Sequence, residues 1–143
     1  MTVTENATGN GVLGQRLLRK EDPALLTGEA VYTNDMKVPG ALWLAVLRSP
    51  FAHARITSID VSGALAMDGV HSAHTGADLA DTWASPMPCA WPVTDDMKNP
   101  AHYPLAVDKV AYVGDGVAAV LAESDTIGRD ALEAIVVEYE PLH

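Results

Sequence analysis

The chain has 143 residues, 48% of them hydrophobic, and a formal net charge of −10 at pH 7. A chain of this length can bury a sizeable core as one domain, whereas its acidity, with no cluster of lysines and arginines to offset it, argues against nucleic acid as a partner. Cys89 is the only cysteine, which excludes an internal disulfide or a thiolate metal cluster, and no apolar run is long enough to span a bilayer.

The first residues of the chain are polar and offer little that could be buried. Residues 1–13 are therefore predicted to be a disordered lead-in to a domain at 14–143. They lack the charged segment followed by an apolar run that marks a secretory signal, so the cytoplasm is the default location. The glycines of Gly9–Gly14 are spaced as in a dinucleotide-binding fingerprint, but no strand leads into them, and the segment is not interpreted as a cofactor site.

Three segments in the middle of the chain have the pattern of strands. Leu42–Leu47 is a continuous apolar run between a Pro-Gly and a Ser-Pro pair, which predicts a strand buried on both faces. Arg55–Val61 is more polar and predicts a strand nearer to a sheet edge. Val70–His74 predicts a third strand.

Short helical signals lie between and after these strands. Ser62 can cap a helix through Met67, and Gly69 can end it with the positive φ that glycine tolerates. Thr75–Asp78 has the spacing of a capping box and opens another helical turn. Strands that alternate with short helices predict a mixed α/β domain.

Residues 80–104 contain five prolines, which exclude a regular helix or a central strand. The same stretch carries large apolar side chains that water does not favour, namely Trp83, Met87, Trp91 and Met97. A loop this long is uncommon inside a compact domain. We therefore expect it to lie against another surface, as in a piece of a larger assembly.

The last third of the chain has the clearest signals. Val110–Val113 and Val117–Glu123 are predicted to be strands joined by a hairpin-like turn at Gly114–Gly116. Ser124 or Asp125 caps the helix that follows.

That helix is expected to present one apolar face, formed by Ile127, Ala131, Ala134 and Ile135. Ile135–Tyr139 is predicted to be the closing strand, which Pro141 ends.

The residues that could carry chemistry form no recognisable site. His71 and His74 are three apart in a predicted strand, so they point to opposite faces and cannot share a metal there. His53, His102 and His143 have no acidic or sulfur partners at ligand spacing. Cys89 has no basic neighbour to lower its pKa, and Asp95-Asp96 favours a solvated acidic loop over a cation site. No catalytic, cofactor-binding or metal-binding residue is assigned.

Several segments, in order, resemble the start of the large subunit of the molybdenum hydroxylases, a family of aldehyde oxidases, xanthine dehydrogenases and aerobic carbon monoxide dehydrogenases. The most specific is Leu47-Arg-Ser-Pro-Phe-Ala-His-Ala-Arg-Ile56. The others are Arg19–Gly28, Tyr32–Asp35, Val38–Gly40, Ile59–Asp60, Gly69–Val70, Thr75–Asp78, Pro104–Gly114, Val117–Glu123, Ala131 and Val137–Leu142. The opening Glu21-Asp22-Pro23 to Thr27-Gly28 is most similar to the carbon monoxide dehydrogenase type.

The resemblance implies an α/β (α+β) fold, a small mixed-sheet α/β-hammerhead domain. It implies that a longer region after this domain binds a molybdenum–pterin cofactor, with flavin and iron–sulfur subunits as partners. None of the family's cofactor or catalytic residues maps onto this chain, so it is expected to be inactive alone. Arg48 is expected to anchor a carboxylate or carbonyls, and His53 a backbone group. Asp115-Gly116 stands where the family more often has Glu-Pro, which is expected to loosen that turn.

Two hypotheses follow. In the first, the chain is a fragment or split subunit that supplies scaffold and interface to a molybdenum-dependent oxidoreductase. In the second, it is a free-standing binding or assembly module with the same fold and no molybdenum role. If the first hypothesis holds, an isolated chain is expected to self-associate through residues 83–103, or to leave them mobile, because exposed apolar patches tend to find partners.

Overall fold

The computed structural model describes residues 16–88 and 94–143. The lead-in predicted at 1–13, the glycines of Gly9–Gly14, and the side chains of Cys89 and Trp91 lie outside these residues. The chain divides into two units, one before Gly40 and the other formed by Gly40–His143.

The first unit contains two short helical elements that the sequence analysis did not predict. They are α1 (Asp22–Thr27) and the 3₁₀ turn η1 (Thr33–Asp35). Pro23 stands in the first turn of α1 and Gly28 forms its C-cap. Proline at the start and glycine just past the end are typical of helices, so the signal was present in the sequence.

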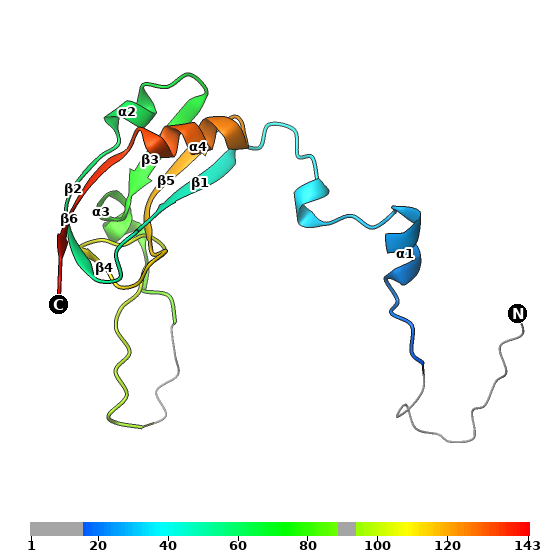
Figure 1. Cartoon of the computed structure of the whole chain (residues 1–143), viewed down its shortest axis with the longest axis horizontal. Coiled ribbons are helices and arrows are strands. Elements are labelled where there is room, and N and C mark those ends of the chain that lie inside the picture. Colours follow the sequence, from blue (N-terminus) through cyan, green and yellow to red (C-terminus); the bar gives the residue numbers. More distant parts are fainter. Residues whose placement is uncertain (1–15, 89–93) are drawn as a thin grey trace, which may run out of the picture. The chain divides into compact units, whose positions relative to one another are not determined.

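The larger unit contains a sheet in the order β1-β5-β3, formed by β1 (Trp43–Arg48), β5 (Gly116–Ala122) and β3 (Val70–Thr75). All pairings are antiparallel, and α4 (Asp125–Glu133) lies across one face of the sheet (Figure 1). The predicted strands are confirmed. However, β1 is an edge strand of this sheet and Leu44 is 64% exposed, so the prediction that it is buried on both faces is wrong.

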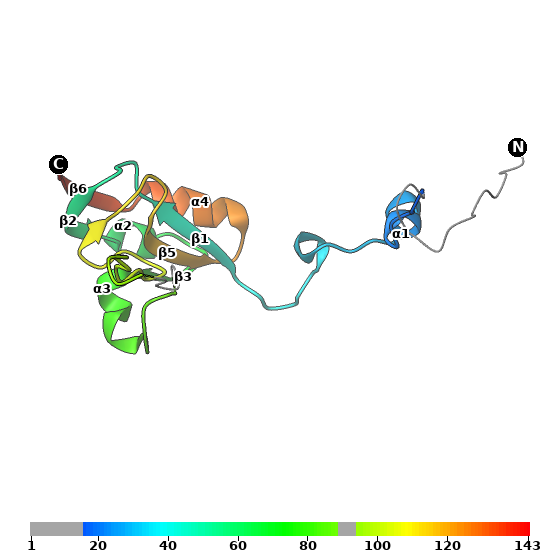
Figure 2. The ribbon, with the colours of Figure 1, turned by 90° about the horizontal axis from the view of Figure 1, so that it is seen from below.

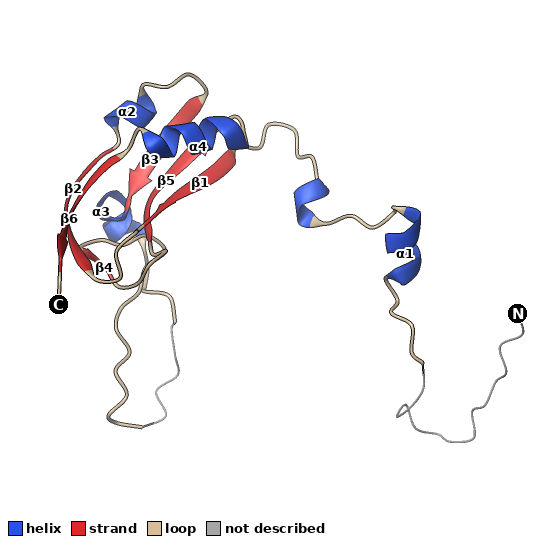
Figure 3. Ribbon diagram, viewed as in Figure 1, coloured by secondary structure: helices blue, strands red, loops and turns tan. Residues whose placement is uncertain are grey.

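A second antiparallel sheet has β2 (Ala54–Asp60) between β4 (Lys109–Val110) and β6 (Val136–Pro141), as Figure 3 shows. Strands β2 and β6 run side by side in both views of the ribbon (Figure 2). The prediction that the second strand lies near an edge is therefore wrong.

The hairpin predicted across residues 114–116 is also wrong, because β4 pairs with β2 whereas β5 pairs with β1 and β3. The turn moves the chain from one sheet to the other. Alternation of side chains predicts that a segment is a strand, but it does not identify the neighbouring strand.

Capping predictions hold at two of three helices in this unit. In α3 (Gly76–Leu79), which η2 (Ala80–Thr82) follows, the Thr75 backbone N–H donates to Asp78 Oδ2 at 2.8 Å and the Asp78 N–H donates to Thr75 Oγ1 at 3.3 Å. Ser124 accepts from Ile127 N–H at 3.2 Å and caps α4.

Helix α2 (Ser62–Leu65) differs from the prediction. Its first N–H is bound by the side chain of Asp60, 2.8 Å from the Ser62 nitrogen, so the predicted cap by Ser62 is wrong. Gly69, two residues beyond the predicted end of this helix, has φ 83°. An L side chain rarely adopts this conformation, so the positive φ predicted for Gly69 is confirmed. Its predicted role as the end of the helix is wrong, because α2 ends at Leu65 and has Ala66 as its C-cap.

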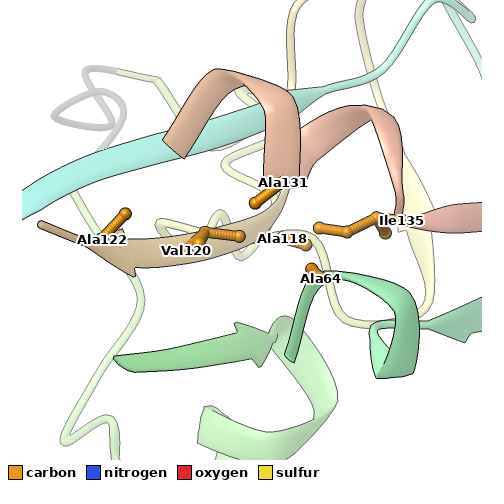
Figure 4. Close-up of a cluster of buried hydrophobic side chains, with 6 residues drawn as sticks. All are labelled: Ala64, Ala118, Val120, Ala122, Ala131 and Ile135. Carbon is orange, nitrogen blue, oxygen red and sulfur yellow. The ribbon is translucent and has the colours of Figure 1, made fainter. Parts of the chain in front are cut away.

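The main core lies between the first sheet and the helices α4 and α2 (Figure 4). Its fully or nearly buried members are Ala64, Ala118, Val120, Ala122, Ala131 and Ile135. Most of them are alanines, which let the helices approach the sheet closely. The alternate residues Ala118, Val120 and Ala122 of β5 thus fill one face of the sheet, and their neighbours face the other way.

Candidate docking interface

The most specific motif of the sequence, Leu47–Ile56, forms a joint between the two sheets. Arg48 Nη1 donates to the Gly114 carbonyl at 2.8 Å. Ser49 and the 114–115 turn exchange two backbone hydrogen bonds, from Ser49 N–H to the Asp115 carbonyl and from Gly114 N–H to the Ser49 carbonyl, each 2.8 Å long. The prediction that Arg48 anchors a carbonyl is confirmed.

The buried side chain of Asp115 stabilises the same turn. It is only 3% exposed, and its Oδ2 accepts a hydrogen bond from Ala111 N–H at 3.0 Å. The next residue, Gly116, accepts from Ala106 N–H at 2.7 Å. The turn at Asp115-Gly116, which was expected to be loosened, is therefore held by hydrogen bonds from both Ala111 and Ala106. The buried carboxylate of Asp115 stabilises the fold.

The histidines are not brought together. His71 Nε2 lies 3.4 Å from Glu123 Oε1, and His74 Nε2 lies 3.1 Å from Ser72 Oγ, so the two have separate partners. His102 Nε2 is 3.3 Å from the Tyr112 hydroxyl. The His53 carbonyl accepts from Leu142 N–H at 2.9 Å, whereas the role predicted for the His53 side chain stays a prediction.

The face of the first sheet opposite α4 carries two rows of side chains across the strands. Leu44 of β1 is paired with Leu121 of β5, and Leu121 with Ser72 of β3. The second row joins Val46, Ala119 and His74 in the same order. Leu44 is largely exposed and the others are half-buried. We call this face the open face and define it by these six residues.

The open face is apolar at its centre and along β1, and polar along β3. Four of its six residues are aliphatic, and the sheet carries them on a rigid antiparallel frame. On the opposite face of the same sheet, Ala118, Val120 and Ala122 of β5 are fully buried, and Leu47 of β1 and Ala73 of β3 are partly buried against them. A sheet that packs on one face and leaves an apolar second face is typical of a domain that docks on another surface.

The Pro-rich stretch is partly organised in its described residues. The rings of Trp83 and Tyr103 stack with centroids 5.1 Å apart and an interplanar angle of 14°. Met87 N–H donates to the His102 carbonyl at 2.7 Å, which forms an isolated antiparallel bridge. Trp83 therefore has an aromatic partner within the same stretch.

The carboxylate of Asp78 has a shifted pKa. Two hydrogen bonds from Thr75, one from its backbone and one from its side chain, lower the pKa of Asp78 below the usual 3.8.

Within residues 16–88 and 94–143, no group of three His, Cys, Asp or Glu side chains lies close enough to hold a metal ion. In the same residues every buried side-chain nitrogen and oxygen has a hydrogen-bond partner.

No helix among the described residues has the length and apolar character needed to cross a membrane.

Two small antiparallel sheets with short helices packed against them define a small mixed α/β domain. Residues 27–143 match the family described as "Aldehyde oxidase and xanthine dehydrogenase, a/b hammerhead domain". The chain belongs to this family, and the resemblance and the fold class expected from the sequence are confirmed.

Known relatives of the chain are oxidoreductases or subunits of them. It is 41% identical over 137 residues to the 6-hydroxypseudooxynicotine dehydrogenase complex subunit gamma of Paenarthrobacter nicotinovorans, a match that covers 91% of the chain and 17% of that subunit. Quinoline 2-oxidoreductase from Pseudomonas putida 86 matches with a TM-score of 0.81 and 42% identity, over 89% of the chain and 16% of the solved one.

A further solved structure, the copper- and molybdenum-containing carbon monoxide dehydrogenase, matches with a TM-score of 0.76 and 36% identity. Here the match covers 90% of the chain and 15% of that subunit. The chain thus spans about one sixth of the proteins it resembles, as a domain or a fragment of a molybdenum hydroxylase large subunit would.

Proposed function

We propose that this chain is the N-terminal scaffold and interface domain of a molybdenum–pterin-dependent hydroxylase large subunit, and that it is not catalytic alone. The open face is the observation that carries the proposal. Leu44, Val46, Ala119 and Leu121 present an apolar sheet surface in a chain that spans about one sixth of its relatives. Burial of apolar surface is the dominant favourable contribution to most protein–protein association.

The described residues do not fit the molybdenum–pterin cofactor. Their buried polar side chains, Ser49, Thr75 and Asp115, are all used in hydrogen bonds within the fold. No cluster of metal ligands is present in the described part of the chain. We therefore assign the cofactor to the rest of the large subunit and derive no chemical step from this domain.

The remaining partners are proposed on the same basis. The name of the relative described as a complex subunit supports assembly with further chains, for which we propose the flavin and iron–sulfur subunits of the family. We place the assembly in the cytoplasm and the domain at residues 14–143. Without its partners, the chain is proposed to self-associate through residues 83–103.

An exchange of domains tests the proposal. In the copper- and molybdenum-containing carbon monoxide dehydrogenase, the segment that aligns with this chain is replaced by the chain itself, and a matched variant lacks the segment. We expect the chimera to assemble and to retain the molybdenum content per large subunit of the unaltered enzyme, whereas the deletion loses it. A chimera that is expressed but holds no more molybdenum than the deletion contradicts the proposal, and the free-standing module becomes the better interpretation.

A further inference from the structure

Residues 16–39, which we call the arm, carry many apolar side chains and bury none of them. Eight large hydrophobic residues of the arm are at least 40% exposed: Leu17, Leu18, Leu25, Leu26, Val31, Tyr32, Met36 and Val38. No residue in this range is buried. A segment of this composition gains nothing from being ordered by itself, because it removes almost no apolar surface from water.

The backbone of the arm is nevertheless built for a defined conformation. Gly28 ends α1 in the left-handed region, and the N–H groups of Glu29 and Ala30 both donate to the Ala24 carbonyl, at 2.9 and 3.0 Å. Tyr32 N–H donates to Asp35 Oδ2 at 3.0 Å and fixes the next turn. Local hydrogen bonds thus shape the arm without covering its leucines, which reduces the entropy lost when it binds.

The charge of the arm differs from that of the rest of the chain. Residues 16–39 hold four basic and four acidic side chains, whereas residues 40–143 hold five basic and fourteen acidic ones. Three of the four basic residues, Arg16, Arg19 and Lys20, flank Leu17 and Leu18. A surface that receives this part of the arm is therefore expected to be apolar with acidic groups at its rim.

Relatives of the chain share part of the arm, and they contain chain that could form such a surface. Residues 40–143 make up less than three quarters of the chain, so matches that cover 89% to 91% of it must include part of the segment before Gly40. The relatives that share this segment contain about five times more chain than the match itself. A partner large enough to cover the arm is thus present in the same subunit of each relative.

We propose that the arm is a docking element whose leucines bind an apolar groove with an acidic rim on the remaining part of the large subunit. The inference rests on the proposed function. It assigns Leu17, Leu18 and Leu26, which are 66%, 74% and 87% exposed, as the anchors. Arg16, Arg19 and Lys20 orient the arm on the rim. The arm and the open face are separate docking elements, the first a segment with short helical turns and the second one side of a sheet.

Hydrogen exchange of residues 16–39 tests the inference, in the isolated 143-residue chain and in the assembled chimera with carbon monoxide dehydrogenase. In the isolated chain we expect fast exchange, because a six-residue helix is marginal by itself. In the chimera we expect exchange at least about tenfold slower. A Leu17→Ser/Leu18→Ser/Leu26→Ser variant should lose this protection, and a Glu21→Gln/Glu29→Gln control in the same arm should keep it.

The outcomes separate the two proposals. If the chimera assembles but the amides of the arm exchange as fast as in the isolated chain, the proposal that the arm docks is contradicted. The proposed function is not affected by this result. If the chimera does not assemble, the proposed function is contradicted, and so is the docking proposal that rests on it. Protection in the isolated chain that grows with its concentration would identify a second copy as the occupant and would also overturn the inference. Exchange across β5 in each variant checks that the larger unit is folded.

Discussion

Single residues of the Leu47–Ile56 motif, and of the 114–115 turn that it contacts, stabilise the fold. Arg48 of β1 donates a hydrogen bond to the turn that leads into β5, and the buried Asp115 accepts one within that turn. Ala54, two residues before this motif ends, is fully buried in a second core cluster, together with Ala106, Val110 and Val117. Residue types that could have served catalysis, an arginine and a buried carboxylate, thus stabilise the connection between two sheets. The sequence resemblance predicted this for Arg48, whereas nothing in the residue pattern predicted the position of Asp115.

The capping box of α3 makes a prediction about pH. The pKa of Asp78 is lowered by hydrogen bonds from Thr75, so its ionised form stabilises the fold above the usual pKa of 3.8. This contribution is lost as the pH falls through the lowered value. Asp78→Asn should lower the free energy of unfolding at pH 7 by up to about 1 kcal/mol, and the difference from the unaltered chain should shrink below pH 4.

Urea unfolding of both chains at pH 7 and at pH 3 measures this difference. Asp130→Asn provides a matched control on a carboxylate of α4 and should change little at either pH. A difference between Asp78→Asn and the unaltered chain that is constant over this pH range would mean that the charge of Asp78 does not act through the capping box.

At the scale of elements, the sequence predicted most strands and helices of the larger unit but not their arrangement. Apolar runs and caps are local signals, and they identified β1, β3, β5, α3 and α4. The neighbours of a strand depend on contacts far apart in the chain. For that reason the edge position of β1, the central position of β2 and the separation of β4 from β5 were not foreseen. The open face was also missed, because a continuous apolar run resembles a strand buried on both faces.

The one-sided packing of β5 makes a second prediction. Val120 is fully buried beneath α4, whereas Val136 of β6 is 61% exposed. Val120→Ala should lower the free energy of unfolding by about 2 kcal/mol, since it removes buried methyl groups and leaves a cavity. The identical change at Val136 should stay within about 0.5 kcal/mol. Urea unfolding at pH 7 compares the two, and equal losses would contradict the assigned core.

At the scale of the whole molecule, stability and assembly should depend on opposite faces of the same sheet. Side chains that face α4 hold the domain together, and side chains of the open face remain for the rest of the large subunit. Leu44 is the best probe, because it is 64% exposed and lies on β1, at the edge of the sheet. Its replacement removes little buried apolar surface from the isolated domain.

The most direct measurement is therefore made on Leu44→Ser in two settings, with Val136→Ser as a control of similar exposure. In the isolated chain, both changes should alter the free energy of unfolding by no more than about 0.5 kcal/mol. In the carbon monoxide dehydrogenase chimera, Leu44→Ser should reduce the fraction of assembled, molybdenum-containing enzyme at least about fivefold, the effect of roughly 1 kcal/mol of lost interface. The control should leave that fraction unchanged. Full assembly of the Leu44→Ser chimera would contradict the assignment of the open face as the docking interface.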